Sequence, residues 1–215
     1  MAHAIAQGYG RGLDFREIES LVPIIASGSK GIQEAGILLK LPQSTVVSAV
    51  CCLQRYNVIS AHAPPKLEQV ELIAGCLLVA SKQTGSEHVD WSDVLTVSRH
   101  LADSKTIEFV RSSLEVESEI LGQTNFHRYA ISPHIIAMDY LTTLGLLRIA
   151  QTGWNTLNDA LRTPLYVLQS QNVLAAGAIS HTCGKSFIAL PLEWWICFDV
   201  TKTELDVFAY WIERV

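Results

Sequence analysis

Two segments of this sequence would be apolar on every side if they formed helices. They are "LIAGCLLVASK", residues 72–82, and "VLAAGAISHTCGK", residues 173–185. A helix that is apolar all round belongs in the centre of a bundle, and the small residues in both segments let neighbouring helices approach closely. The segments lie roughly one small domain apart, so the sequence predicts two helical bundles, each built around its own central helix.

The length and composition of the chain fit this division. Its 215 residues allow one large domain or two of about 100 residues each. A net charge of -5 gives no global attraction to nucleic acid or to acidic membranes. The nearly uncharged stretch at residues 32–56 is interrupted by polar residues and by Pro42, so it predicts two amphipathic helices rather than a membrane span. The first residues, "MAHAIAQGYGRG", lack the regions of a secretory signal.

Helical periodicity and helix-terminating residues extend over most of the chain, while alternating strand patterns are weak. Residues 1–30 read as an arm with one helix, capped by Asp14 and limited by Pro23. Further helices are expected in nine segments: 32–39, 42–53, 66–82, 92–105, 106–126, 133–149, 154–168 with a bend at Pro164, 171–185 after a Ser170 cap, and 201–215 with Thr201 or Thr203 as cap. The expected core residues are Leu77, Leu78, Ala80, Ile120, Leu121, Leu174, Ala175, Ala178 and Ile179. The inward apolar stripe of the segment 106–126 is expected to contain Ile107, Val110, Leu114, Val116, Ile120 and Leu121. The fold class is therefore all-α.

No group of residues has the spacing of a catalytic or metal site. The five cysteines form no ligand motif, and their odd number at apolar positions predicts reduced, buried thiols in the cytosol or nucleus. The histidines that would attract a metal or base interpretation have no partner in an HExxH-like pattern; they are His62, His88, His127, His134 and His181. Cys183 is expected in the core, and Asp139 and Asp159 on the surface. Trp194 and Trp195 fit an exposed anchor or the core equally well.

Several segments, taken in order, resemble the cyclin family. "AGILLKLPQSTVVSAVCCLQRY" is similar to the first two helices of L-type transcriptional cyclins, and "LIAGCLLVASK" resembles the central helix of a cyclin box. "VESEILGQTNF" is similar to the fifth helix, "SPHIIAMDYL" to the start of the second box, and "PLEWWICFDVTKTEL" to a late turn of that box. The resemblance is greatest to cyclin L, then to the Q and K types. It implies tandem cyclin boxes, two five-helix bundles, at residues 31–130 and 131–215.

The resemblance implies a regulatory subunit that binds and activates a cyclin-dependent kinase and does no chemistry itself. It assigns the kinase contact to Lys82, at the end of the central helix, and to Glu117, in the fifth helix. Without the resemblance, Lys82 would only cap its own helix and Glu117 would be a solvated acid. Many cyclins have two acidic residues after this lysine, whereas Gln83 and Thr84 stand here. This departure predicts an altered kinase contact.

The expected location is the nucleus, with a kinase linked to transcription or pre-mRNA splicing as partner. We expect no cofactor, no metal, no direct nucleic-acid contact and no membrane. One alternative is a general transcription factor of the transcription factor IIB type, which has the same doubled fold; the acidic net charge and the lack of a cysteine ribbon count against it. A second alternative is a cyclin-fold adaptor without a kinase.

Overall fold

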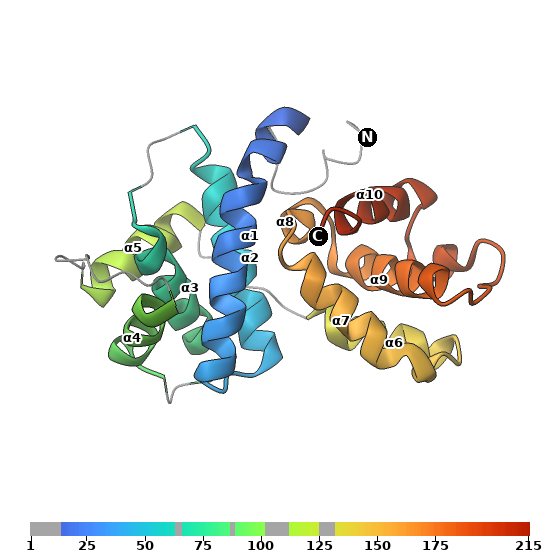
Figure 1. Ribbon diagram of the computed structural model, residues 1–215, viewed down its shortest axis with the longest axis horizontal. Helices are drawn as coiled ribbons and strands as arrows, with labels where there is room; N and C mark the ends of the chain where they lie inside the picture. The colour runs from blue at the N-terminus through green and yellow to red at the C-terminus, as the bar shows by residue number, and fades with distance from the viewer. Residues whose placement is uncertain (1–13, 63–65, 87–88, 102–111, 125–131) are drawn as a thin grey trace. The chain divides into compact units, whose positions relative to one another are not determined.

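The computed structural model describes residues 14–62, 66–86, 89–101, 112–124 and 132–215. These residues form helices and turns without any β-strand, so the predicted all-α class is confirmed. The chain divides into two compact units (Figure 1). We call residues 19–130 the first unit, and residues 131–215, with which residues 14–18 group, the second unit. Within the described ranges, no helix has the length and apolarity to cross a membrane.

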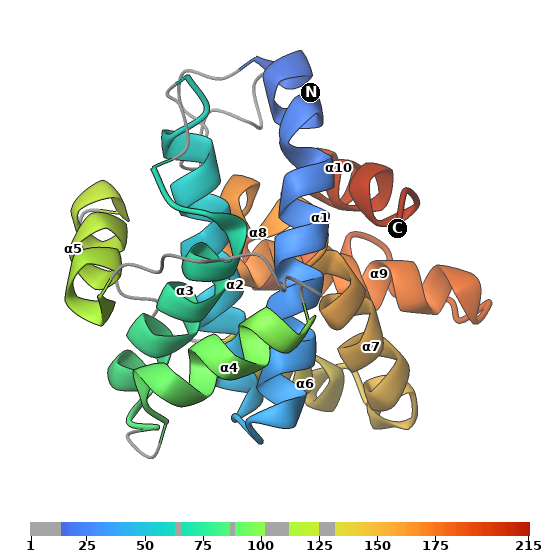
Figure 2. The same ribbon diagram turned by 60° about the vertical axis from the view of Figure 1, so that its left-hand side comes forward.

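The first unit is arranged around α3 (Gln69–Thr84), with α2 (Gln43–Ile59), α4 (Trp91–Leu101) and α5 (Ser113–Thr124) packed against it (Figure 2). Glycines bring α1 (Phe15–Leu38) close to the same helices. A Cβ atom on Gly31 would lie 2.8 Å from Ile73 on α3, and one on Gly36 would lie 2.5 Å from Val46 on α2. The predicted central position of residues 72–82 is therefore correct.

One long helix, α1, stands where the sequence predicted an arm helix limited by Pro23 and a second helix from Ile32. It runs through Pro23 and across residues 30 and 31 without a break. Its buried side chains Ile18, Ile25 and Ile32 are spaced by two helical turns, so they form one stripe. Burying each isoleucine contributes about 1.5–3 kcal/mol, which offsets the roughly 3 kcal/mol cost of the internal proline.

Most of the predicted core residues are buried. Leu77, Leu78, Ala80 and Ile120 are buried in the first unit, but Leu121 is only half-buried and Leu114 is exposed. The reason is that α5 packs against α3 and α2 through a narrow stripe, Val116 and Ile120, four residues apart. Residues 102–111 and 125–131 lie outside the described part of the chain, and with them residues 106–111 of the predicted helix at 106–126 and its last residues, including Phe126.

The second unit is built around α9 (Gln171–Lys185). Four helices pack against α9: α6 (Pro133–Thr143), α7 (Ala150–Ala160), α8 (Leu165–Leu168) and α10 (Lys202–Ile212). The unit also contains two short 3-10 helices, η2 (Leu147–Ile149) and η3 (Trp194–Phe198). The four predicted core residues are buried: Leu174, Ala175, Ala178 and Ile179. The predicted helix at 154–168 is divided into α7 and α8, with Pro164 immediately before α8. Thr201 caps α10 by accepting the backbone N–H of Glu204.

The tryptophan and cysteine expectations have different outcomes. Trp194 is buried in the core cluster of the second unit, and Trp195 packs partly buried against that cluster, so both residues fold into the unit. Four cysteines are buried as expected, but Cys197 is exposed. Cys197 lies on η3, which contacts the core cluster through Trp194, Trp195 and Phe198, while the side chain of Cys197 stays at the surface.

Candidate functional site

Lys82 and Glu117 lie together, although 35 residues separate them in the sequence. Lys82 Nζ donates hydrogen bonds to both carboxylate oxygens of Glu117, at 2.8 Å to Oε1 and 2.7 Å to Oε2. The lysine side chain is 59% exposed and the glutamate side chain 15%. The amine is therefore open to a partner, while the carboxylate is largely enclosed and is no solvated surface acid.

A glycine on α3 sets the position of this pair. A Cβ atom on Gly75 would lie 2.5 Å from both Val116 Cγ1 and Ile120 Cδ1, so α5 crosses α3 in close contact at Gly75. Lys82 follows Gly75 by seven residues, which is two helical turns, and lies on the same face of α3. Glu117 follows Val116 directly. The crossing therefore directs the carboxylate of α5 toward the last turn of α3.

The end of α3 fixes Lys82 in its last turn. Gly85 has a φ of 76°, in the left-handed region, and the Ser86 N–H donates to the Ser81 carbonyl at 2.8 Å. This arrangement is a Schellman ending, with glycine at the position where left-handed backbone is required. A cation in the last turn is favoured by the helix dipole. The helix thus holds Lys82 at its exposed end.

Thr84 has a structural role where the resemblance would place an acid. Its hydroxyl donates to the Ala80 carbonyl at 2.8 Å and lies 2.7 Å from the hydroxyl of Thr45, in the first turn of α2. Thr45 also lies 3.2 Å from the Ser86 hydroxyl. The residues after Lys82 are thereby tied to α2. Thr45 precedes Thr84 by 39 residues, so no local sequence pattern reveals this connection.

Leu114 adds an exposed apolar side chain on the same helix as Glu117. It lies one turn before Glu117 on α5 and is exposed. Sequence reasoning placed Leu114 in the inward stripe and so missed it. A second ion pair, Lys66–Glu119 at 3.0 Å, joins the segment before α3 to another position on α5. The surface at Lys82, Leu114 and Glu117 combines an exposed cation with an apolar side chain, which suits a protein partner.

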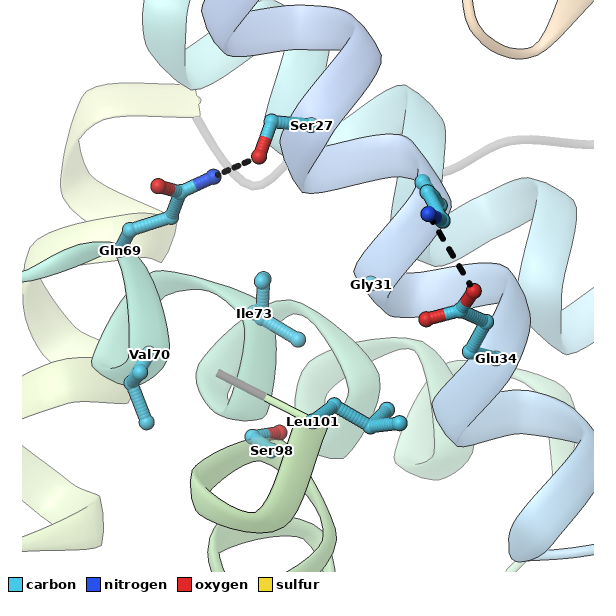
Figure 3. A pocket seen from close by; sticks show the side chains of 9 residues that line it. Ser27, Gly31, Glu34, Gln69, Val70, Ile73, Ser98 and Leu101 are labelled. Carbon is cyan, nitrogen blue, oxygen red and sulfur yellow. Dashed lines mark hydrogen bonds and ion pairs between the residues drawn. The ribbon is translucent and has the colours of Figure 1, made fainter. Parts of the chain in front are cut away.

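A cavity of about 340 Å³ lies between α1, α3 and α4 of the first unit (Figure 3). At one end Gln69 Nε2 donates to Ser27 Oγ at 3.1 Å, and along α1 the side chains of Lys30 and Glu34 lie 3.8 Å apart. The remaining wall is largely apolar, with Val70, Ile73 and Leu101. Its charged lining residues, Lys30 and Glu34, lie next to each other on α1, so the cavity offers no acid and base facing one another.

His134 has a structural role in the second unit. His134 is buried; its Nε2 lies 3.0 Å from Asn158 Oδ1 and its Nδ1 lies 3.1 Å from Ser132 Oγ. Burial lowers the pKa of His134 to about 4, although the hydrogen bond with Asn158 acts in the opposite direction. Burial and the Lys185 charge also lower the pKa of His181. Across the described ranges, no three His, Cys, Asp or Glu side chains are grouped to hold a metal ion. His88 and His127 lie outside those ranges.

Comparison with known proteins finds relatives that are named as L-type cyclins. The chain is 31% identical over 214 residues to an uncharacterized cyclin-L1-like protein of Schizosaccharomyces pombe, covering 89% of this chain and 82% of that relative. It is 30% identical to cyclin-L1-1 of Arabidopsis thaliana over 81% of this chain, and 30% identical to cyclin-L1 of Danio rerio over 90%. The chain spans only 45% and 41% of the length of these last two relatives. No family model matches the chain.

Proposed function

Because this chain belongs to the cyclin-L-like family, we propose that it is a regulatory subunit that binds and activates a cyclin-dependent kinase. The observation that carries the proposal is the pairing of Lys82 with Glu117 at the exposed end of the central helix. Lys82, in the last turn of α3, and Glu117, on α5, are joined by a bidentate contact and form a preorganised polar surface. Leu114 supplies apolar area beside it.

In the free protein, Lys82 donates hydrogen bonds to both carboxylate oxygens of Glu117, and both groups keep hydrogen-bonding capacity for a partner. On kinase binding, Lys82 would donate to backbone carbonyls of the kinase and Glu117 would accept backbone N–H groups. Hydrogen bonds that involve a charged group are the stronger kind. Since the two side chains are already aligned, little conformational entropy is lost when the kinase binds. The pair therefore acts as one recognition unit.

The activation mechanism follows from differential binding. A cyclin-dependent kinase is active when its catalytic lysine, its glutamate and its magnesium ligands are aligned. A subunit that binds this arrangement more tightly than the inactive one shifts the kinase population toward it. The Lys82–Glu117 surface needs only to contact the kinase backbone in its active arrangement. No catalytic side chain of this chain takes part, and the purified chain should hydrolyse no nucleotide.

The cellular role is proposed at the level that the family supports. The relatives carry the name cyclin-L, so we place the protein in the nucleus with a kinase linked to transcription or pre-mRNA splicing. A kinase-free adaptor remains the second candidate, because Thr84 takes the place of an acid and is bonded to Thr45. The two candidates differ in whether a kinase co-purifies with the tagged chain from its own cells.

The test measures binding of the purified kinase to variants of this chain by calorimetry. Lys82→Ala or Glu117→Ala should weaken binding about tenfold or more, since an unpaired buried donor or acceptor costs about 1–3 kcal/mol. The matched control is Lys66→Ala with Glu119→Ala, a second ion pair that involves α5, which should bind as the wild type does. The double variant Lys82→Ala, Glu117→Ala should be less than additive. If both single variants bound the kinase with wild-type affinity, Lys82 and Glu117 would not form the kinase-binding site.

A further inference from the structure

Among the residues that the structure describes, five chain reversals use the same Schellman ending, and one of them carries an unexpected residue. In each ending a backbone N–H bonds to a carbonyl five residues back and the preceding residue has left-handed backbone. The left-handed residues are Lys40, Gly85, Gly145, Phe187 and Asp199. Glycine is favoured at this position, and a polar residue is a common substitute. Phe187 is neither.

The fold gains nothing from the side chain of Phe187. The ending of α9 is complete without it, since Phe187 N–H donates to Gly184 at 3.3 Å and Ile188 N–H donates to Cys183 at 2.9 Å. The phenyl ring is 97% exposed. A residue that strains the backbone and packs against nothing lowers stability without a structural return, which is typical of a functional position.

Phe187 is accompanied by two further exposed apolar residues before α10. Leu192 is 92% exposed and Ile196 is 59% exposed. We call residues 187–196 the apolar segment; it leaves the end of α9 and runs into the first residues of η3 (Figure 1). The segment is held firmly, because Ile188, Leu190 and Trp195 pack against the core of the second unit. It therefore presents protruding apolar side chains on a fixed backbone.

We propose that the apolar segment is a docking surface for a partner protein that offers a concave apolar pocket with basic side chains at its rim. Side chains this exposed are convex, so they insert into a pocket. Glu193, between Leu192 and Ile196, and Asp199, after Ile196, are exposed and acidic, whereas the exposed Lys185 precedes Phe187. The two acids favour basic side chains on the part of the rim that faces Leu192 and Ile196. The same acids disfavour an anionic membrane.

The size of the surface argues against self-association. Three such side chains present on the order of 400 Å² of apolar area. One face of a standard stable interface buries about 800 Å². The segment is therefore about half of what a second copy of this chain would need, and it fits the anchor of a smaller interface. This surface belongs to the second unit, so it adds a partner beyond the kinase proposed for Lys82 and Glu117.

The experiment places a photoreactive benzoylphenylalanine at position 187 of the full chain in its own cells, with the same group at the exposed Lys202 as positional control. The expected adduct forms at position 187 only and contains a protein other than this chain. That protein is then purified, and its dissociation constant is measured for the wild type, for Phe187→Gly with Leu192→Ser, and for Lys40→Gly. Lys40 has the same backbone geometry as Phe187, so Lys40→Gly controls for the backbone change.

Binding should weaken at least tenfold in the Phe187→Gly, Leu192→Ser variant and stay unchanged in Lys40→Gly. The melting temperature of Phe187→Gly should be equal to or above that of the wild type. The proposal is overturned by an adduct of twice the chain mass, which would indicate a second copy, or by sedimentation with anionic vesicles that depends on Phe187. Absence of any adduct, wild-type affinity of the double variant, or a lowered melting temperature of Phe187→Gly would overturn it equally.

Discussion

In both units the last helix crosses the central helix at a glycine, but the residues around the two crossings differ. Gly75 of α3 admits Val116 and Ile120 of α5, and Gly177 of α9 admits the ring of Phe208 of α10. The residue after Val116 is Glu117, which binds Lys82. The residue after Phe208 is Ala209, and with Lys185 it lines an open cavity of about 220 Å³.

The two helix ends differ in the same way. The left-handed residue after α3 is Gly85, whereas the one after α9 is Phe187. The first unit therefore places a charged pair at the end of its central helix, and the second unit places apolar side chains there. The interior contacts of a repeated bundle are shared because they hold the fold together. The surface residues at the same places are free to acquire separate binding roles.

The largest expected difference between the two units is the loss of folding stability of the second unit in acid. His134 of the second unit has a folded-state pKa of about 4, below its ordinary 6.5, so the unfolded chain binds a proton where the folded chain does not. As the pH falls from 6.5 to 4, stability should decrease by up to about 3 kcal/mol. Denaturant unfolding followed by tryptophan fluorescence reports this loss, since Trp154 packs against His134 at 4.6 Å between ring centroids. His134→Gln should flatten the pH dependence; an identical slope in the variant would contradict the assignment.

The glycine crossings should be sensitive to a single methyl group. Gly75→Ala and Gly177→Ala each place a Cβ atom against a packed side chain, and each should destabilise by about 1–3 kcal/mol. Gly122→Ala in α5 and Gly184→Ala in α9 are matched controls, because their Cβ atoms would have open space. These controls should stabilise by about 0.5–1 kcal/mol. The free energy of unfolding of each variant is measured by chemical denaturation. An equal change at the crossing and control positions would mean that the helices do not depend on glycine at the crossings.

Exchanging the residues that follow the central helices should reverse their contributions. Phe187→Gly relieves left-handed backbone strain and loses no packing, so it should stabilise by about 1 kcal/mol. Gly85→Ala introduces the same strain after α3 and should destabilise by a similar amount. Urea unfolding of the two variants tests both signs. A loss of stability in Phe187→Gly would mean that the ring packs in the folded protein.

The smallest effect on stability is expected from placing on α10 a carboxylate that corresponds to Glu117 on α5. Ala209→Glu should provide Lys185 with a partner, because both residues line one cavity. A half-exposed ion pair contributes about 0.2–1 kcal/mol. A double-mutant cycle with Lys185→Ala isolates this coupling from the loss of helix propensity and from the nearby Glu213 charge. Zero coupling would indicate that the two crossings differ in geometry as well as in residue type.

The sequence predicted the features that depend on local pattern. The two central helices, the Thr201 cap and the position of Pro164 follow from helical periodicity and helix-terminating residues, and all agree with the structure. The pair at Lys82 and Glu117 was located by resemblance, and the structure places the two side chains in contact. That contact does not test the kinase-binding role, which stays a proposal.

The features that escaped prediction depend on packing between distant residues. Pro23 was taken as a helix limit because the continuous stripe of Ile18, Ile25 and Ile32 is buried only in the folded chain. Leu114 and Leu121 looked like core residues because periodicity does not show how narrow the α5 contact is. The hydroxyl contact of Thr45 with Thr84 joins segments 39 residues apart and leaves no local pattern.

The exposure of Cys197 makes the second unit directly accessible to spectroscopy. The other four cysteines are buried, so a maleimide fluorophore should attach at one place in the natural sequence, without cysteine substitutions. That place directly follows Ile196, at the end of the apolar segment. A dye there would sense a nearby partner as a change in anisotropy or emission colour. Titrations with candidate proteins can then be read in real time on an otherwise unaltered chain.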